Sequence, residues 1–175
     1  MNGSLGLKLA VMALLSIVSA CGDDEPSDPA TATSFTATLL GANEVPAVTT
    51  TATGTATLTV SGNQITYAIT ATNLQNAVLG HIHIGAAGQN GPVRLNLCGT
   101  GAPEPACNSG TGVVVVATGT NGTTVGAPPI TFDELLTAMR SGDAYVNVHT
   151  SAPGCTPGAA GCNPGGEIRG QVVSN

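Results

Sequence analysis

Basic residues are almost absent from this sequence. Its 175 residues include only Lys8, Arg94, Arg140 and Arg169, against ten acidic residues. Such a chain has no basic surface with which to neutralise phosphates, so nucleic-acid binding is excluded. No lysine follows Lys8, and this excludes a P-loop, which needs a lysine directly after its glycine-rich loop.

Aromatic and charged side chains are scarce as well. Aromatic residues make up 2% of the chain and charged residues 8%, and tryptophan does not occur. Glycine, threonine, alanine and valine are abundant instead, a mixture typical of short strands joined by tight turns and not of a helical bundle. The length suits a single domain with one core.

The apolar run near the N-terminus is too short to span a bilayer. It covers residues 9–20, LAVMALLSIVSA, whereas a membrane span needs about 20 apolar residues and a signal-peptide core needs fewer. The run ends in VSAC, which resembles the bacterial lipobox. We therefore expect residues 1–20 to be a lipoprotein signal peptide and Cys21 to carry the lipid. The alternative is an ordinary secretory signal followed by a stray cysteine.

The residues after Cys21 predict where the anchored protein resides. Gly22 stands where an aspartate would favour retention in the inner membrane, so we expect a bacterial cell-envelope protein, in the outer membrane if the organism is Gram-negative. The acyl chains would attach it to the membrane without crossing it. Residues 21–33 are acidic and lack large apolar side chains, which predicts a disordered tether.

Four cysteines remain once Cys21 is set aside. An even number in a chain bound for an oxidising compartment indicates two disulfides. Four cysteines allow three pairings, and the short glycine- and proline-rich segments between neighbours favour Cys98–Cys107 and Cys155–Cys162. A thiolate metal site is the competing interpretation, but both spacings are wider than those of zinc ligand pairs.

From Ser34 onward, small polar residues alternate with apolar ones, a pattern that predicts a meander of antiparallel strands. The apolar run from Val113 to Val116 predicts a more deeply buried strand. One helix interrupts the strands, at about 132–141, because Thr131 and Glu134 have the spacing of a capping box and Gly142 follows as a left-handed cap.

All three histidines of the chain fall on the polar side of predicted strands. His81 and His83 share one face, and the neighbouring isoleucines take the other. The same alternation turns two further sets of polar residues away from the core: Tyr145, Asn147 and His149, and then Glu167, Arg169 and Gln171.

The disulfide pairing also predicts a contact between the last two strands. If Cys155 bonds Cys162, the hairpin brings His149 opposite Glu167 or its neighbour, so a histidine–carboxylate pair is expected. A carboxylate is a common partner of metal-bound histidine. The polar face is then either a metal site or a network of hydrogen bonds that holds loops in place.

Five segments in order resemble the CHRD domain, a module repeated in chordin and found alone in bacterial secreted proteins. They read FTATLLGANEVPAV, GTATLTV, HIHIGAAGQNGPV, DAYVNVHT and GEIRGQVV. The resemblance covers nearly all of the mature chain, and we assign residues 34–175 to this domain. It implies an extracellular module and no reaction.

A fainter resemblance is to Cu/Zn superoxide dismutase, whose fold is a Greek-key β-sandwich. It rests on the two histidines of HIHIG and on a late glycine-rich segment with an arginine. It implies an all-β, antiparallel, Greek-key-like β-sandwich with one short helix, in which His81 and His83 correspond to copper ligands and Arg169 to the late arginine. Dismutase activity is excluded, because the chain has too few histidines for a copper and a zinc ion.

Three hypotheses for the function follow. The first is an anchored binding module that holds one copper or zinc ion at His81, His83 and His149, with Tyr145, Asn147, Glu167, Arg169 and Gln171 as a supporting polar cluster. The second is a metal-free adhesion or scaffold module with an extracellular protein or glycan partner. The third is a metal-dependent redox enzyme, although no residue is assigned as catalytic.

Overall fold

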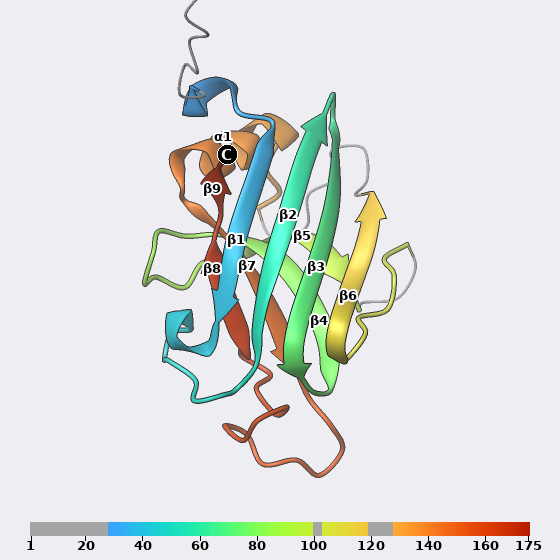
Figure 1. Ribbon diagram of the computed structural model, residues 1–175. Helices are drawn as coiled ribbons and strands as arrows, with labels where there is room; N and C mark the ends of the chain where they lie inside the picture. The colour runs from blue at the N-terminus through green and yellow to red at the C-terminus, as the bar shows by residue number, and fades with distance from the viewer. Residues whose placement is uncertain (1–27, 100–102, 119–127) are drawn as a thin grey trace, which may run out of the picture.

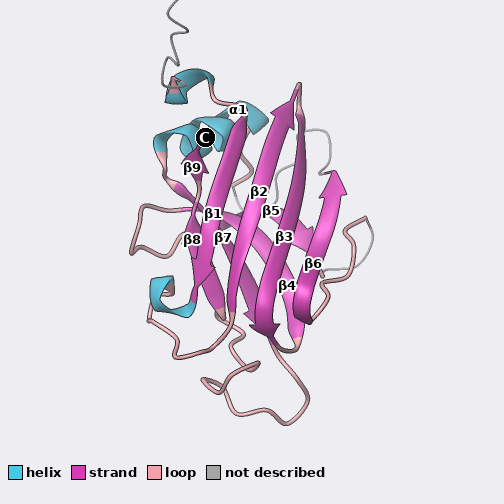
Figure 2. Ribbon diagram, viewed as in Figure 1, coloured by secondary structure: helices cyan, strands magenta, loops and turns pink. Residues whose placement is uncertain are grey.

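The computed structural model describes residues 28–99, 103–118 and 128–175. Strands account for most of its regular structure, with two short 3-10 helices and one α-helix (Figure 2). The predicted signal peptide and Cys21 lie outside the described residues, as does most of the tether. The elements in chain order are η1 Pro29–Thr31, β1 Ser34–Leu40, η2 Gly41–Asn43, β2 Thr53–Ser61, β3 Gln64–Leu74, β4 Ala77–Ile84, β5 Val93–Cys98, β6 Gly110–Thr118, α1 Phe132–Ser141, β7 Ala144–Thr150, β8 Ile168–Gln171 and β9 Val173–Ser174.

The strands form one sheet that folds over into two layers. Its order is β5-β4-β7-β8-β1-β2-β3-β6, with β9 paired to β1, and every pairing is antiparallel. In Figure 1, β1, β2, β3 and β6 form the front layer, and β4, β5 and β7 lie behind it. The sheet is nearly closed, since the Tyr67 hydroxyl on β3 donates a hydrogen bond to the Leu97 carbonyl on β5. The predicted all-β class with one short helix is confirmed.

The core lies between the two layers and follows the alternation of the strands. Along β2 and β3 the apolar residues are buried and the threonines between them face solvent. Phe35 and Leu58 come from the front layer, and Ile82 and Val146 from the rear one. Burying such side chains stabilises the fold by roughly 1.5–3 kcal/mol each.

Both short-range predictions about local structure are confirmed. Helix α1 begins after Thr131, whose side chain forms the capping box with Glu134, and ends at Gly142 in the left-handed region, with φ of 76°. The cysteines pair as Cys98–Cys107 and Cys155–Cys162. No helix among the described residues is long and apolar enough to cross a membrane.

The prediction that Val113 to Val116 is deeply buried is wrong. β6 forms an edge of the sheet, and Val113 and Val116 are 53% and 61% exposed. A bulge against β3 leaves Val114 between two paired positions, so Val114 and Val115 are both buried. An apolar run therefore marks a strand here, but its place at the edge determines which valines are covered.

Candidate metal centre

Two neighbouring strands of the rear layer bring the three histidines together. β4 and β7 pair so that His81 lies opposite Asn147 and His83 opposite Tyr145, and His149 follows two residues after Asn147. Alternate residues of a strand share a face, so all five side chains stand on the same side of the sheet. One ring nitrogen from each histidine lies within 4.8 Å of the others.

The sequence pattern predicts that this polar face points outward, and the structure shows instead that it is covered. All seven residues of β7 are buried, and the three histidines are 7–8% exposed. The loop 85–92 contacts His83, and the loop that precedes β8 contacts His149. Alternation decides which face a side chain takes, whereas loops distant in sequence decide whether that face meets water.

Two backbone carbonyls fix the protonation pattern of the imidazoles. Nδ1 of His83 lies 2.9 Å from the Gly91 carbonyl oxygen, and Nδ1 of His149 lies 2.9 Å from the Pro164 carbonyl oxygen. A carbonyl can only accept, so each Nδ1 carries the hydrogen and each Nε2 keeps a free lone pair. The His149 Nε2 is 3.0 Å from Nδ1 of His81. The buried Nε2 of His83 has no hydrogen-bond partner.

Burial lowers the pKa of all three histidines. The pKa of His81 falls to about 4, because burial and the neighbouring His149 and His83 disfavour its charged form. The pKa values of His83 and His149 are also lowered, chiefly by burial, although their carbonyl partners oppose the shift. At neutral pH the cluster is therefore three neutral imidazoles, the form that ligates metals.

We expect the metal-free protein to lose stability when the pH falls from 7 to 5. Unfolded histidine titrates near pH 6.5, above the folded value of about 4 for His81, so the unfolded chain binds more protons in this window. The stabilisation is complete above pH 6.5 and declines as the pH falls towards 4, by about 1–2 kcal/mol for His81 at pH 5. Urea denaturation at several pH values measures it.

Glu44 opposes this trend, which provides a control. Burial raises its pKa to about 7, despite the nearby Arg169 and a hydrogen bond from Asn147. The folded state therefore binds the extra proton between pH 4.5 and 7, and this contribution declines as the pH rises. Glu44→Gln removes it, so acid should destabilise the variant more steeply than the wild type. Stability that is level or rises below pH 7 in both proteins would contradict the assignment.

A stack of three side chains holds His83 from the side. Its ring lies parallel to Tyr145, with centroids 4.7 Å apart, and the Arg169 guanidinium carbon lies 3.4 Å from the centroid of the Tyr145 ring. Arg169 also donates to the carbonyls of Ala86 and Gln89 and to the side chain of Asn90. Arg169 thus ties the loop that contains Gly91 to the sheet.

Gln171 and Tyr145 complete the frame around this loop. The Gln171 amide donates to the carbonyls of Gly85 and Gly142, and the Gly91 amide donates to the Tyr145 hydroxyl. The polar residues predicted from β7 and β8 therefore surround the histidines, with the exception of Glu167.

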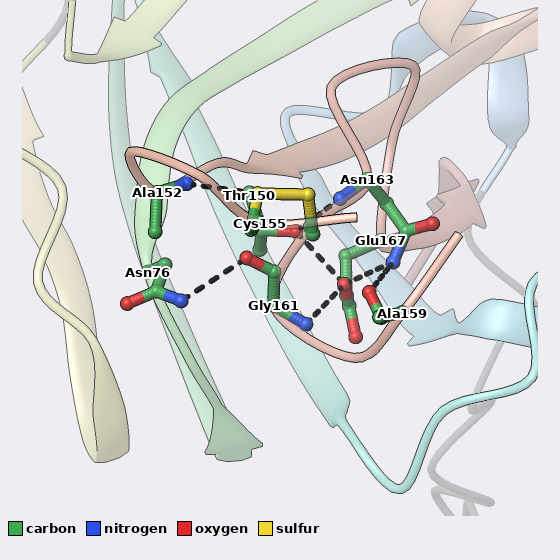
Figure 3. The surroundings of a disulfide bond; sticks show 9 residues. Asn76, Thr150, Ala152, Cys155, Ala159, Gly161, Asn163 and Glu167 are labelled. Carbon is green, nitrogen blue, oxygen red and sulfur yellow. Dashed lines mark hydrogen bonds between the residues drawn. A yellow bond between two sulfur atoms is a disulfide. The ribbon is translucent and has the colours of Figure 1, made fainter. Parts of the chain in front are cut away.

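The predicted histidine–carboxylate pair does not form. The pairing of Val148 with Ile168 does place His149 beside Glu167 along the strands, but Glu167 turns into the loop closed by Cys155–Cys162. There it accepts hydrogen bonds from four donors (Figure 3): the hydroxyls of Thr50 and Thr150, the Gly161 amide and the Asn163 side chain. These bonds lower its pKa although burial opposes them. The loop backbone, at Pro164, serves as the partner of His149 instead.

Sequence reasoning missed Glu44 as a residue of the site. Its carboxylate is 6% exposed and accepts two hydrogen bonds from the Asn147 amide nitrogen, at 3.0 and 3.1 Å. It lines two hollows, one with Arg169 and Gln171 and the other with Pro164 and Gly166. A charged residue in a segment without strand alternation was the only signal, and it does not indicate burial.

One comparison with known proteins identifies a relative of this fold. The model of the CHRD domain family matches residues 35–172. No curated protein and no solved structure matches the chain.

Proposed function

Since the chain belongs to the CHRD domain family, we propose that it is a binding module that holds one divalent copper or zinc ion at His81, His83 and His149. Family membership itself names no reaction and no ligand. The observation that carries the proposal is the buried Nε2 of His83, which has no partner of its own and stands beside two other neutral imidazoles.

The spacing of the nitrogen atoms suits a single ion. Imidazole nitrogens bind zinc at about 2.0–2.1 Å, so two ligands of one ion at angles of 90–110° lie about 2.9–3.4 Å apart. The 3.0 Å between Nδ1 of His81 and Nε2 of His149 falls in this range. The widest separation in the set is 4.8 Å, and a rotation that moves one nitrogen by about 1 Å would bring all three within reach.

The groups behind the ligands support the same proposal. Metal-bound histidines commonly donate their second ring hydrogen to a carbonyl or carboxylate, which orients the ring and increases its basicity. Gly91 and Pro164 supply such carbonyls to His83 and His149. Three imidazoles without a thioether or thiolate favour Cu(II) or Zn(II) over Cu(I).

A metal-free adhesion or scaffold module is the second candidate. It is favoured by the His81–His149 contact, which is a satisfied hydrogen bond if Nδ1 of His81 donates to Nε2 of His149. Under this alternative the three histidines only stabilise the sheet, and the partner is an extracellular protein or a glycan. The unpartnered nitrogen of His83 then has no role.

We also propose that the module is attached to the cell envelope through lipidated Cys21. The support is the VSAC sequence and the short apolar run before it. Labelling of cells with a radioactive fatty acid should mark the wild-type protein and leave the Cys21→Ser variant unlabelled.

Metal analysis tests the proposed site. We expect the purified protein, incubated with Cu(II) or Zn(II) and then desalted, to retain about one equivalent of metal. The His81→Ala/His83→Ala double variant should retain none, whereas Thr57→Ala on the exposed face of β2 should behave like the wild type. Retention by the double variant, or by none of the three proteins, would reject this site. In the latter case the metal-free candidate would gain support.

A further inference from the structure

A second buried polar atom without a partner lies next to the histidines. Only three side-chain atoms in the described part of the chain are buried without a hydrogen bond: Nε2 of His83, Oδ1 of Asn147 and Nε of Arg94. The first two belong to the adjacent strands β4 and β7, on the same face. An amide oxygen enclosed in this way is costly unless a donor reaches it.

The orientation of the Asn147 amide is set by its other end. Its Nδ2 donates to both oxygens of Glu44. If the amide were turned over, its oxygen would face the carboxylate and both bonds would be lost. Gly166 packs directly over this pair, since a Cβ at that position would collide with Nδ2 of Asn147 and both oxygens of Glu44. Oδ1 is thus held as an acceptor that no group of the described chain uses.

The register of the sheet places this acceptor at the histidine cluster. Asn147 is the direct partner of His81 across the β4–β7 pair, and His149 lies two residues further along the same face. Directly opposed residues of an antiparallel pair have Cβ atoms only about 4.5–5.5 Å apart. Asn147 is 3% exposed, so bulk water does not satisfy it.

The histidines leave one coordination position of the ion for a ligand from outside the protein. Among the described residues, the cluster of metal-ligating side chains contains three members. A tetrahedral ion has four positions, and sites with three protein ligands and one open position are those that accept water or another small ligand. The slight exposure of the histidines, 7–8%, restricts that ligand to a few atoms.

We infer that the metal site proposed above is an open one, whose fourth position takes a small protic ligand that donates a hydrogen bond to Oδ1 of Asn147. Water and ammonia belong to this class, as do the amino or hydroxyl ends of small molecules. An aprotic anion such as azide would present lone pairs to the amide oxygen and is disfavoured. Glu44 acts through Asn147 by holding the amide nitrogen, and it is a positioning residue.

Ligand competition on the cobalt-loaded protein tests this inference. Co(II) has visible absorption bands that respond when a ligand enters its coordination sphere, so azide and ammonia can each be titrated at pH 8, with ammonia expressed as the free base. In Asn147→Leu the acceptor is lost. We expect azide to bind more tightly relative to ammonia, by about tenfold, as the loss of one hydrogen bond and the relief of one repulsion predict. Glu44→Gln keeps an acceptor for Nδ2 and should shift this ratio less than threefold.

The readouts separate the possible failures. Cobalt content and the melting temperature are measured for every variant, and Asn147→Ser repeats the titrations if the leucine variant does not fold. An unchanged azide-to-ammonia ratio in a folded, loaded variant overturns the inference and leaves the metal site standing. Loss of cobalt from a folded Asn147 variant also overturns it, because Asn147 would then be a ligand itself. A wild-type protein that binds no cobalt, copper or zinc rejects the proposed function, and the inference with it.

Discussion

Replacing Glu167 with alanine is expected to lower the free energy of unfolding by about 3–5 kcal/mol, because four buried donors lose their acceptor together. Those donors come from the segment after β1, the end of β7 and the disulfide loop. The carboxylate is 1% exposed, so water does not replace it. Urea denaturation with the disulfides intact measures the change.

Two further measurements identify the cause of this loss. Glu167→Gln keeps one acceptor oxygen and should cost less than the alanine variant, while Asp133→Asn on the exposed side of α1 should change stability by less than about 0.5 kcal/mol. The pKa of Glu167 is lowered on folding. Its stabilisation is therefore complete above the unfolded value of 4.5 and is lost as the pH falls through the folded value. If the alanine variant were as stable as the wild type, the four hydrogen bonds would not contribute as described.

Replacing Gly91 with alanine is expected to abolish metal binding and to destabilise the protein by several kcal/mol. A Cβ at this position would overlap the carbonyl of Ile84 and crowd Gly85. The backbone would have to move, although its carbonyl and amide bind His83 and Tyr145. Misplacing that carbonyl would free the His83 ring to turn, and second-shell changes alone reduce metal affinity by 10–100-fold.

Gly165 provides the matched control for this prediction. It lies in the other loop over the site, next to Pro164, and a Cβ there would meet nothing within 4 Å. Gly165→Ala should retain about one equivalent of metal and the wild-type melting temperature. Equal behaviour of the two alanine variants would show that the loop 85–92 does not position His83.

Most of the fold follows from local patterns in the sequence. The capping box at Thr131 and the left-handed Gly142 define the helix, because both act within one turn of backbone. Short loops bring each cysteine close to its partner. The alternation of small polar and apolar residues marks the strands, since the pleat repeats every two residues. The same patterns do not show which strand lies at an edge, and the burial of Val113 and Val116 was therefore predicted wrongly.

The candidate site divides along the same line. The sequence by itself determined that His81, His83, Asn147 and His149 stand on polar faces, because residue parity is a property of one strand. Only the tertiary structure decided that β4 and β7 are neighbours, that two loops cover the histidines, and that Glu44 holds Asn147 while Glu167 turns into the disulfide loop. Strand order and loop packing depend on contacts between segments up to about a hundred residues apart, for example 103 between Glu44 and Asn147. No local pattern of residue types specifies such contacts.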